Sequence, residues 1–516
     1  MKRFNTTGIC YPHKHYMVDI TERLQLIRRM IDQGDYFCIN RGRQYGKTTT
    51  LYHLKKFLEP DYVVFSLSFE RLDDKQFESE ESLGYGFFRL IYRSLKNNLI
   101  SGLAEESELK ITKIVEEDKP IPLFKCSAII EDICIRQKIV LMIDEVDQAS
   151  NHQSFVKFLG MLRAMFLQRE DVPTFQSVIL AGVYDIKNLK LKMRPEEEHQ
   201  YNSPWNIAVP FSVDMSLQAD GIAGMLRDYK MEHSVDFDEV AVAQEIRDYT
   251  YGYPFLVSRI CQIMDEKGSK WNHEGVVDAV HDILNESNTL FDDMVKKMDD
   301  FPDLQKLLRN ILFVGERKSI SVYEKYVELG LKFCFLRAEG NVVKIANRII
   351  ETVLYNLFIA EDNNQQIYTE GSIDKNQFIH DGILDVRRLI ERFSVHFNDI
   401  YGKKDEAFVE RHGRQFFLLY LRPIINGIGN YYIEAETRDE TRTDIVIDYN
   451  GRQYVIETKV WRGNAYNERG EAQLSEYLDY FHLNEGFMVS FCFNKGKKPG
   501  VQAVAVRGKR IIEAIV

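Results

Sequence analysis

The hydrophobic pattern of residues 1–210 alternates short, nearly continuous apolar runs with segments whose apolar residues recur every three or four positions. Continuous runs are typical of strands that are buried on both faces of a parallel sheet, and the longer period is typical of amphipathic helices. The sequence predicts a helix at 154–169 and strands at 35–40, 62–69, 138–145 and 177–182. This alternation favours an α/β fold with a parallel sheet.

The pattern changes after this region. Residues 211–294 have helical periodicity, and we expect a helical lid there. A helix followed by a hairpin that turns at Glu339-Gly340-Asn341 predicts a winged helix over 295–360. The chain then becomes polar and aperiodic, so we interpret 361–395 as a linker before a last α/β domain at 396–516.

Two alternating runs in the last domain flank Asn450-Gly451, and this dipeptide is the strongest short signal for a two-residue hairpin turn. Counting back from the turn places Asp444 directly opposite Glu457. Lys459 shares their face, because strand side chains repeat every second residue. Like charges that lie directly opposite each other destabilise a sheet, so the pairing needs an explanation.

A solvated sheet edge with Lys459 as the compensating charge is one explanation for the facing acids. The hairpin is otherwise apolar enough to belong to a core, and a shared divalent cation explains the pair better. Mg²⁺ takes oxygen ligands, which Asp444, Glu457 and the backbone carbonyl of Thr458 could supply. Such a site can hydrolyse a phosphodiester, because the metal activates water and the Lys459 ammonium positions or deprotonates it.

The segment from Arg41 to Leu51 carries the elements of a phosphate-binding loop between a strand and a helix. Glycines allow a tight turn whose amides face the phosphates, a lysine reaches the β- and γ-phosphates, and a hydroxyl holds Mg²⁺. Gly42 lies one place later than the first glycine of the usual motif, and Thr48 is the expected Mg²⁺ ligand. The residues expected to contact the nucleotide are Gly42, Gly46, Lys47, Thr48 and Thr49.

A pair of acids follows the apolar run Ile139–Ile143. Asp144 lies at the carboxyl end of this expected strand, where it could hold Mg²⁺ through water, and Glu145 could orient the attacking water. Exposed acids after a buried strand are the structural alternative. Because both motifs occur in the expected order, we predict nucleotide binding and hydrolysis, with Glu145 as a catalytic residue.

The length of 516 residues exceeds what one core supports and indicates roughly three or four domains. No apolar run approaches the ~18 residues of a membrane span, and the first residues lack the apolar stretch of a signal peptide. Seven scattered cysteines form no C-x-x-C pair, which indicates reduced thiols and neither a disulfide framework nor a zinc site. We therefore expect a cytoplasmic protein that does not enter a membrane.

The net charge of −11 argues against a uniformly basic surface for nucleic acid. Basic clusters nevertheless gather in the last ~115 residues, at Lys403-Lys404, Arg411–Arg414, 494–500 and 507–510. Each cluster by itself is explained as solvated surface. Their concentration in the domain that carries the facing acids favours nucleic acid as the partner, with DNA as the expected substrate.

The nucleotide-site motifs and later segments together resemble the AAA-like ATPases of the AAA+/STAND group found in bacteria. The resemblance covers about 1–360, and its segments are NRGRQYGKTTTL, LMIDEVD, SVILAGVYDIKNL, YNSPWNIAVPF and YTYGYPFLVSRI. Where that family commonly has Pro-Arg-Arg-like residues before its Gly-Lys, this chain has Gly42-Arg43-Gln44. The resemblance implies ATP and Mg²⁺ as ligands, with Gly252 and Pro254 near the base of the nucleotide.

The same resemblance implies two sensor positions. One would lie after the fourth strand, at Tyr184 or Asp185. The other would be an arginine that senses the γ-phosphate, at Arg194 or Arg259, and a surface or capping arginine is the structural alternative for each.

The hairpin resembles the PD-(D/E)XK nuclease superfamily. The resemblance covers about 400–490 and implies Asp444 as the isolated acid and Glu457-Thr458-Lys459 as the ExK element. Arg442-Thr443 stand before Asp444, so the literal Pro-Asp of the superfamily name is absent.

Two helices near the hairpin agree with this resemblance. A helix at 471–481 places Gln473 and Tyr477 on one face, similar to the QxxxY element of many members, and Gln473 is an expected catalytic residue. In the amphipathic helix before the hairpin, Glu410, or Glu406, would be the additional acid beside the metal.

Together these patterns predict an α/β protein with a P-loop ATPase core at 1–210, a helical lid, a winged helix and a C-terminal restriction-endonuclease-like domain. We expect the nucleotide state to gate a Mg²⁺-dependent nuclease through domain rearrangement or homo-oligomerisation, and genome or anti-phage defence would suit this architecture. The alternative is a nucleotide-switched sensor whose nuclease-like domain grips nucleic acid or a protein partner without cutting.

Overall fold

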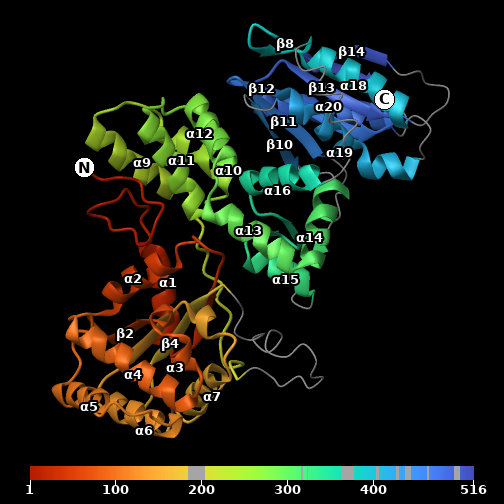
Figure 1. The fold of residues 1–516 in the computed structure, drawn as a ribbon. Coiled ribbons are helices and arrows are strands. Elements are labelled where there is room, and N and C mark those ends of the chain that lie inside the picture. The colour runs from red at the N-terminus through yellow and green to blue at the C-terminus, as the bar shows by residue number, and fades with distance from the viewer. Residues whose placement is uncertain are drawn as a thin grey trace. The chain divides into compact units, whose positions relative to one another are not determined.

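The chain forms two compact units (Figure 1). The first comprises Met1–Ser234 and Tyr253–Ser258, and the second comprises Val235–Gly252 and Arg259–Val516. The computed structural model describes residues 1–183, 204–314, 318–321, 324–361, 377–401, 406–425, 429–435, 443–461, 464–492 and 500–516. Within these ranges, every helix is too short or too polar to cross a membrane.

The first unit contains a four-stranded parallel sheet, as the sequence predicts. Its strands are β1 (Phe37–Asn40), β2 (Val63–Ser68), β3 (Ile139–Asp144) and β4 (Ser177–Gly182). The order β1-β4-β3-β2 places β4 between the strand that enters the phosphate-binding loop and the strand that ends in Asp144. Both loops therefore leave the sheet at the carboxyl ends of its strands.

Helices cover both faces of this sheet (Figure 1). Apolar residues of α1 (Thr21–Asp32) and α2 (Lys47–Leu58) share one core with alternate strand residues such as Ile39 and Val140. The other strand residues, such as Leu141, share a second core with the remaining layer. That layer includes α4 (Glu80–Lys96), α6 (Leu123–Cys134) and α7 (Gln153–Leu167), and α7 is the helix predicted at 154–169. The other α-helices in the described part of this unit are α3 (Asp74–Phe77), α5 (Glu105–Glu116) and α9 (Ala219–His233).

The second unit begins with helices and a small sheet. The helices are α10 (Glu239–Thr250), α12 (His273–Asn285), α13 (Thr289–Asp300), α14 (Pro302–Arg309), α15 (Lys325–Lys332) and α16 (Arg348–Glu361), and α11 (Pro254–Lys267) crosses the division between the units. A π-helical turn follows α14 at Asn310–Val314. The strands β5 (Lys318–Ser319), β6 (Leu336–Glu339) and β7 (Val342–Ile345) are ordered β5-β7-β6. The predicted hairpin is confirmed, with Gly340 in its turn at φ 57°.

The linker prediction at 361–395 is wrong over its second half. Residues 362–376 lie outside the described part of the chain. After them, β8 (Ile379–His380) pairs with β9 (Ile383–Leu384), and α18 (Val386–Tyr401) begins. Val386, Leu389, Ile390 and Phe393 recur at helical spacing and are buried, so this stretch contributes to the core of the domain that follows it.

A six-stranded mixed sheet forms the core of the C-terminal part. The strands are β10 (Gly429–Ala435), β11 (Thr443–Tyr449), β12 (Arg452–Val460), β13 (Glu485–Phe491), β14 (Gly500–Val506) and β15 (Lys509–Ile515). Their order is β10-β11-β12-β13-β15-β14, with β10, β11 and β12 antiparallel and with β12, β13 and β15 parallel. Helix α19 (Glu406–Ile425) precedes β10, and α20 (Asn464–Tyr480) connects β12 to β13.

Helices lie on opposite faces of this sheet. On one face, the ring of Phe397 in α18 lies 5.2 Å from that of Phe491, and a Cβ atom on Gly413 of α19 would lie 2.8 Å from Phe491. On the other face, a Cβ atom on Gly486 would lie 2.8 Å from Leu478 of α20. Because side chains alternate along β13, α20 covers the face opposite to α18 and α19.

The register of the β11–β12 hairpin is as predicted. Tyr449 pairs with Arg452, and Asp444 pairs with Glu457. Asn450 and Gly451 have φ values of 49° and 72°, and a two-residue turn with two positive φ angles matches the twist of the strands. The turn therefore fixes which residues face each other.

Replacing Gly451 tests the role of this turn. Gly451→Ala puts a Cβ atom at φ 72°, where an L-residue is strained by about 1 kcal/mol. Gly500→Ala is the control, since an added Cβ there meets nothing within 4 Å and the residue lacks a positive φ. We expect urea unfolding to show a loss of stability for Gly451→Ala only. Equal effects of the two changes would contradict a special role for the turn.

Candidate functional sites

The phosphate-binding loop forms where β1 passes into α2. Gly46 caps α2 with a left-handed φ of 80°, and Gln44 also has a positive φ. Lys47 is buried at the first turn of the helix, and its Nζ donates to the carbonyls of Arg41 (2.8 Å) and Gly42 (3.0 Å). A helix N-terminus with an ammonium inside its loop is suited to a phosphate group.

The side chains of Thr48 and Asp144 are in contact within the first unit, although the two residues are 96 positions apart in the sequence. Thr48 Oγ1 donates to Asp144 Oδ2 at 2.8 Å, and the backbone N–H of Glu145 donates to Asp144 Oδ1 at 2.9 Å. A hydroxyl beside a carboxylate is a pair of hard oxygen donors of the kind that Mg²⁺ takes when it also binds a nucleotide. The residues present therefore fit the ion expected at this loop.

Glu145 stands beside this pair in a left-handed conformation with φ 54°. Its side chain is half-buried, and burial, followed by the charge of Asp144, raises the pKa of its carboxyl. The nearby Lys47 ammonium opposes that shift. A raised pKa makes this carboxylate a better proton acceptor, which suits a residue that orients a water molecule.

The other residues expected at the nucleotide have separate outcomes. A Cβ atom on Gly46 would lie 3.9 Å from Cγ of Pro254, so Pro254 lies against the phosphate-binding loop, and its place near the base of the nucleotide stays a prediction. Gly252 is in the second unit, where its N–H donates to Thr250 Oγ1. Thr49 Oγ1 accepts from the N–H of Cys10, so its hydroxyl bonds to the N-terminal segment.

The sensor positions are only partly described. Tyr184, Asp185 and Arg194 lie outside the described residues. Arg259 forms an ion pair with Glu286 at 2.7 Å within the second unit. This contact favours the structural alternative for Arg259.

Three acids line up across the C-terminal sheet. The backbone register places Glu434 of β10 opposite Asp444, and Asp444 opposite Glu457. The side chains of Glu434 and Asp444 lie outside the described part, so their placement here is that of the strand positions. The sequence reasoning missed Glu434 because it did not identify β10, for which the alternation in NYYIEAE was the available signal.

Glu457 and Lys459 are buried on the face that α20 covers, with 1% and 5% of their surface exposed. Thr458 points to the opposite face, which leaves only its backbone carbonyl for the predicted ligand role. Buried charges are unfavourable unless other charges, hydrogen bonds or a metal compensate them. This face of the hairpin is therefore not a solvated edge.

A further buried acid lies on the same face and was missed by the sequence reasoning. Met488 pairs with both Glu457 and Glu513, which places the two acids in one row. The fully buried Glu513 carboxylate accepts from Ser490 Oγ at 2.6 Å and from Gln502 Nε2 at 2.7 Å. Ser490 is the strand neighbour of Lys459. Because β12 ends at Val460 and β15 begins only at Lys509, no local sequence pattern predicts this row.

The helices place the remaining predicted residues. Gln473 is half-buried and Tyr477 is buried on α20, one helical turn apart. Glu406 and Glu410 lie in α19, and their side chains are outside the described part. Among the described side chains, no three His, Cys, Asp or Glu residues converge as metal ligands. The metal role of Asp444 and Glu410 stays a prediction.

A polar network lies at the turn end of the hairpin. Tyr249 Oη on α10 donates to Asp448 Oδ2 at 2.9 Å, and both residues are buried. Burial raises the pKa of Asp448 to about 6, although hydrogen bonds from Gln453 and Tyr249 and the nearby His273 oppose this shift. His273 Nδ1 lies 2.5 Å from Glu245 Oε1, and this bond raises the pKa of His273.

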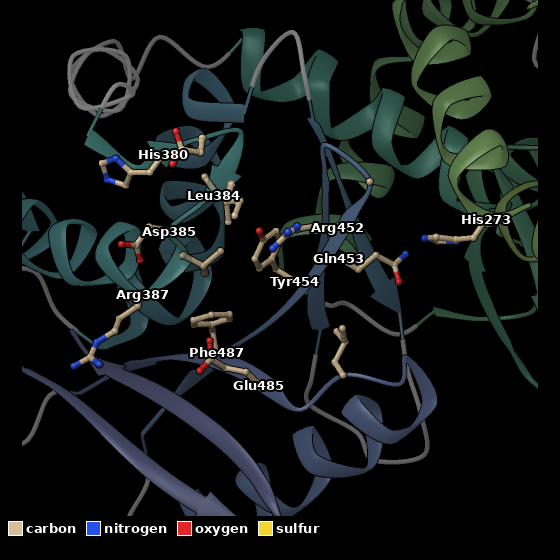
Figure 2. A pocket seen from close by; sticks show the side chains of 15 residues that line it. His273, His380, Leu384, Asp385, Arg387, Arg452, Gln453, Tyr454, Glu485 and Phe487 are labelled. Carbon is tan, nitrogen blue, oxygen red and sulfur yellow. The ribbon is translucent and has the colours of Figure 1, made fainter. Parts of the chain in front are cut away.

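A cavity of about 890 Å³ opens beside this network (Figure 2). The β8–β9 hairpin, the first residues of α18, and parts of β12 and β13 line it, together with His273. Figure 2 shows the side chains of Gln453 and His273 extended toward each other. The wall of the cavity therefore includes two residues, His273 and Gln453, that interact with Asp448.

The family described as AAA-like domain matches residues 13–348, which is more than half of the chain. The chain belongs to the AAA-like domain family. The matched range holds Lys47, Thr48, Asp144 and Glu145, and it ends before the six-stranded sheet. The assignment to AAA-like ATPases thus agrees with the Thr48–Asp144 pair, and it leaves the hairpin acids outside the match.

Two solved structures match part of this chain at low sequence identity. A Walker-type ATPase of Pyrococcus abyssi is 15% identical, with a TM-score of 0.47, over 68% of this chain and 99% of that chain. A RuvB variant of Thermotoga maritima is 13% identical, with a TM-score of 0.30, over 66% of this chain and 95% of that chain. The curated proteins include none that matches this AAA-like chain.

The buried Asp448 predicts a pH dependence of stability. Its pKa is raised from 3.8 to about 6, so the folded state binds more protons than the unfolded state between these values. Ionisation of this carboxyl therefore lowers the free energy of unfolding of the protein as pH rises from 4 to 6. Asp448→Asn should gain on the order of 2–3 kcal/mol relative to the wild type over that window, measured by urea unfolding at each pH. A constant difference across the window would contradict the buried carboxyl.

Proposed function

We propose that this AAA-like protein hydrolyses ATP with Mg²⁺, and that its nucleotide state gates a Mg²⁺-dependent nuclease in the C-terminal α/β domain. The observation that carries the nuclease part is the register of the hairpin. It sets Asp444 opposite Glu457 and places Lys459 on their face, in a sheet core where uncompensated acids are unfavourable. The ATPase part rests on the family and on the Thr48–Asp144 contact.

At the nucleotide site, each residue has a role that follows from its position. The amides at the start of α2 and the Lys47 ammonium bind and orient the phosphates. Thr48 and Asp144 would hold Mg²⁺, which supplies positive charge beside the phosphates when bound. Glu145, with its raised pKa, orients water toward the γ-phosphate.

At the hairpin, the residues are suited to phosphodiester hydrolysis. Asp444 and Glu457 would hold Mg²⁺, with the Thr458 carbonyl as a third oxygen, and the ion would activate water and neutralise developing charge. Lys459 holds an ammonium on the same face, where it positions the attacking water. Gln473 on α20 and Glu410 on α19 are further candidates to orient substrate and ion.

The expected substrate is nucleic acid, with DNA favoured over RNA, and the expected working form is a homo-oligomer. Basic residues of the C-terminal part support a polyanionic substrate. A second candidate function is a nucleotide-switched binding protein that grips nucleic acid or a protein partner without cutting. The basic residues of the C-terminal part support binding of nucleic acid whether or not the hairpin cuts it.

Variants of the loop test the ATPase part. Lys47→Ala should abolish ATP binding, because the phosphate-facing charge and donor are lost, whereas Glu145→Gln should bind ATP and turn it over about 100-fold more slowly. Lys56→Ala is the control, since Lys56 lies on the same helix over the ring of Tyr52. Isothermal titration and phosphate release measure these effects. Unchanged ATP affinity of Lys47→Ala would remove this site.

Variants of the hairpin test the nuclease part. Asp444→Ala, Glu457→Ala and Lys459→Ala should each lower Mg²⁺-dependent cleavage of DNA by about 100-fold or more. Lys459→Ala should retain most of the metal affinity. Without metal, Asp444→Ala should be at least as stable as the wild type, because it relieves like-charge repulsion.

The control for these variants is Glu476→Ala, which removes an exposed acid of α20 that pairs with Arg507. It should cut DNA at the wild-type rate in a gel assay with and without Mg²⁺ and ATP. Binding of DNA or RNA by the wild type without any cleavage would favour the second candidate function.

A further inference from the structure

A buried contact joins the lid helices to the hairpin, and the proposed chemistry does not use it. Tyr249 Oη donates to Asp448 Oδ2 at 2.9 Å between residues that are 199 positions apart. Tyr249 and Asp448 expose only 2% and 3% of their surface. The guanidinium of Arg348 lies 5.7 Å from the Tyr249 ring, so a second helix, α16, also borders the tyrosine.

Asp448 is on the same strand and the same face as Asp444. The two residues are four positions apart on β11, which is about 13 Å along a strand. The pairing of β11 with β10 and β12 continues without interruption between them. A shift of the turn end is therefore carried along a paired strand to the position of Asp444.

The frame around the hairpin is held by other contacts of the second unit. Thr352 Oγ1 on α16 donates to the carbonyl of Tyr431 on β10, and Arg422 on α19 donates to the carbonyl of Asn356 on α16. These bonds attach α16 to the edge of the sheet and to α19. Because β10 is attached to α16, a displacement of α10 would move β11 relative to β10.

The chain continues from α10 directly into the nucleotide site. Tyr251 and Gly252 follow the helix with φ values of 48° and 69°, and the division between the two units falls after Gly252. The next residue, Tyr253, donates its hydroxyl to the carbonyl of Arg43 in the phosphate-binding loop at 2.6 Å. Its ring packs edge-on against Tyr45 at 4.8 Å. Residues 250–252 thus connect Tyr253, which contacts the loop, to Tyr249, which contacts Asp448.

We propose that Tyr249 is a positioning residue through which the nucleotide state of the loop sets the geometry of Asp444 and Glu457. This proposal rests on the proposed function, and it assigns the gating to one hydrogen bond. A change at Arg43 or Tyr45 moves Tyr253, the two left-handed residues transmit that motion to α10, and Tyr249 passes it to β11.

The chemistry of the contact suits a switch with two states. A hydroxyl that donates to a buried carboxylate is a directional bond, and a carboxylate deprived of its donor inside a protein is strongly disfavoured. The turn end of the hairpin should therefore follow Tyr249 instead of separating from it. His273 and Glu245, which pair beside the contact, border the same carboxylate from α12 and α10.

The test removes one oxygen atom. Tyr249→Phe should keep ATP hydrolysis and nucleotide-free cleavage within about twofold of the wild type, and should reduce the change in cleavage caused by a non-hydrolysable ATP analogue by about fivefold or more. Asp448→Asn keeps an oxygen that accepts the bond and should retain the response, whereas Asp448→Leu should lose it. A response in Tyr249→Phe equal to that of the wild type would overturn the proposal.

Tyr326→Phe is the matched control, because Tyr326 Oη donates to Asp303 in the same unit at 2.7 Å, away from the hairpin. It should respond to the analogue as the wild type does, and an equal loss in both variants would also overturn the proposal. Amide hydrogen exchange provides a readout that does not require cleavage. The analogue should change exchange of the Ile445–Tyr449 amides in the wild type and in Tyr326→Phe but not in Tyr249→Phe. An inactive nuclease with this exchange pattern would refute the proposed cleavage and support the coupling.

Discussion

The two-residue turn at Asn450-Gly451 is the constraint on which the C-terminal site depends. Its two positive φ angles fix the pairing of β11 with β12, and a slip by one residue would send Asp444 to the opposite face from Glu457. The same register places Lys459 on the face of the acids and leaves the apolar residues Ile445 and Ile456 for the other side. The conformation of this two-residue turn thus determines which charged residues face each other across the hairpin.

Like charges that face each other on a sheet are costly, and the structure increases this cost by burying Glu457 and Lys459. α20 covers the face on which Glu457, Lys459 and Glu513 lie, so solvent does not screen them. Glu513 is compensated by hydrogen bonds from Ser490 and Gln502. A divalent cation is a suitable counterion for a row that has more carboxylates than ammonium groups, which is the basis of the proposed metal-dependent chemistry.

Sequence patterns predicted what depends on neighbours along the chain. The four strands of the first sheet are continuous apolar runs, and the hairpin register follows from Asn450-Gly451. Sequence patterns did not predict contacts between residues that lie far apart along the chain. Glu434 and Glu513 join the acid row only through strand pairing, and Tyr249 reaches Asp448 across 199 positions. Helix α18 was missed because the polar stretch before it obscured where the helical period of Val386, Leu389 and Phe393 begins.

The second unit combines helices of the AAA-like match, such as α10 and α12, with the six-stranded sheet in one compact body. The central claim is that the facing acids of the hairpin form a metal site. A crystal structure of the full chain grown with Mg²⁺ tests it most directly. The account predicts one ion bound by both Asp444 and Glu457 at about 2.0–2.1 Å. Carboxylates that point to opposite faces of the sheet, or an ion bound to neither, would contradict it.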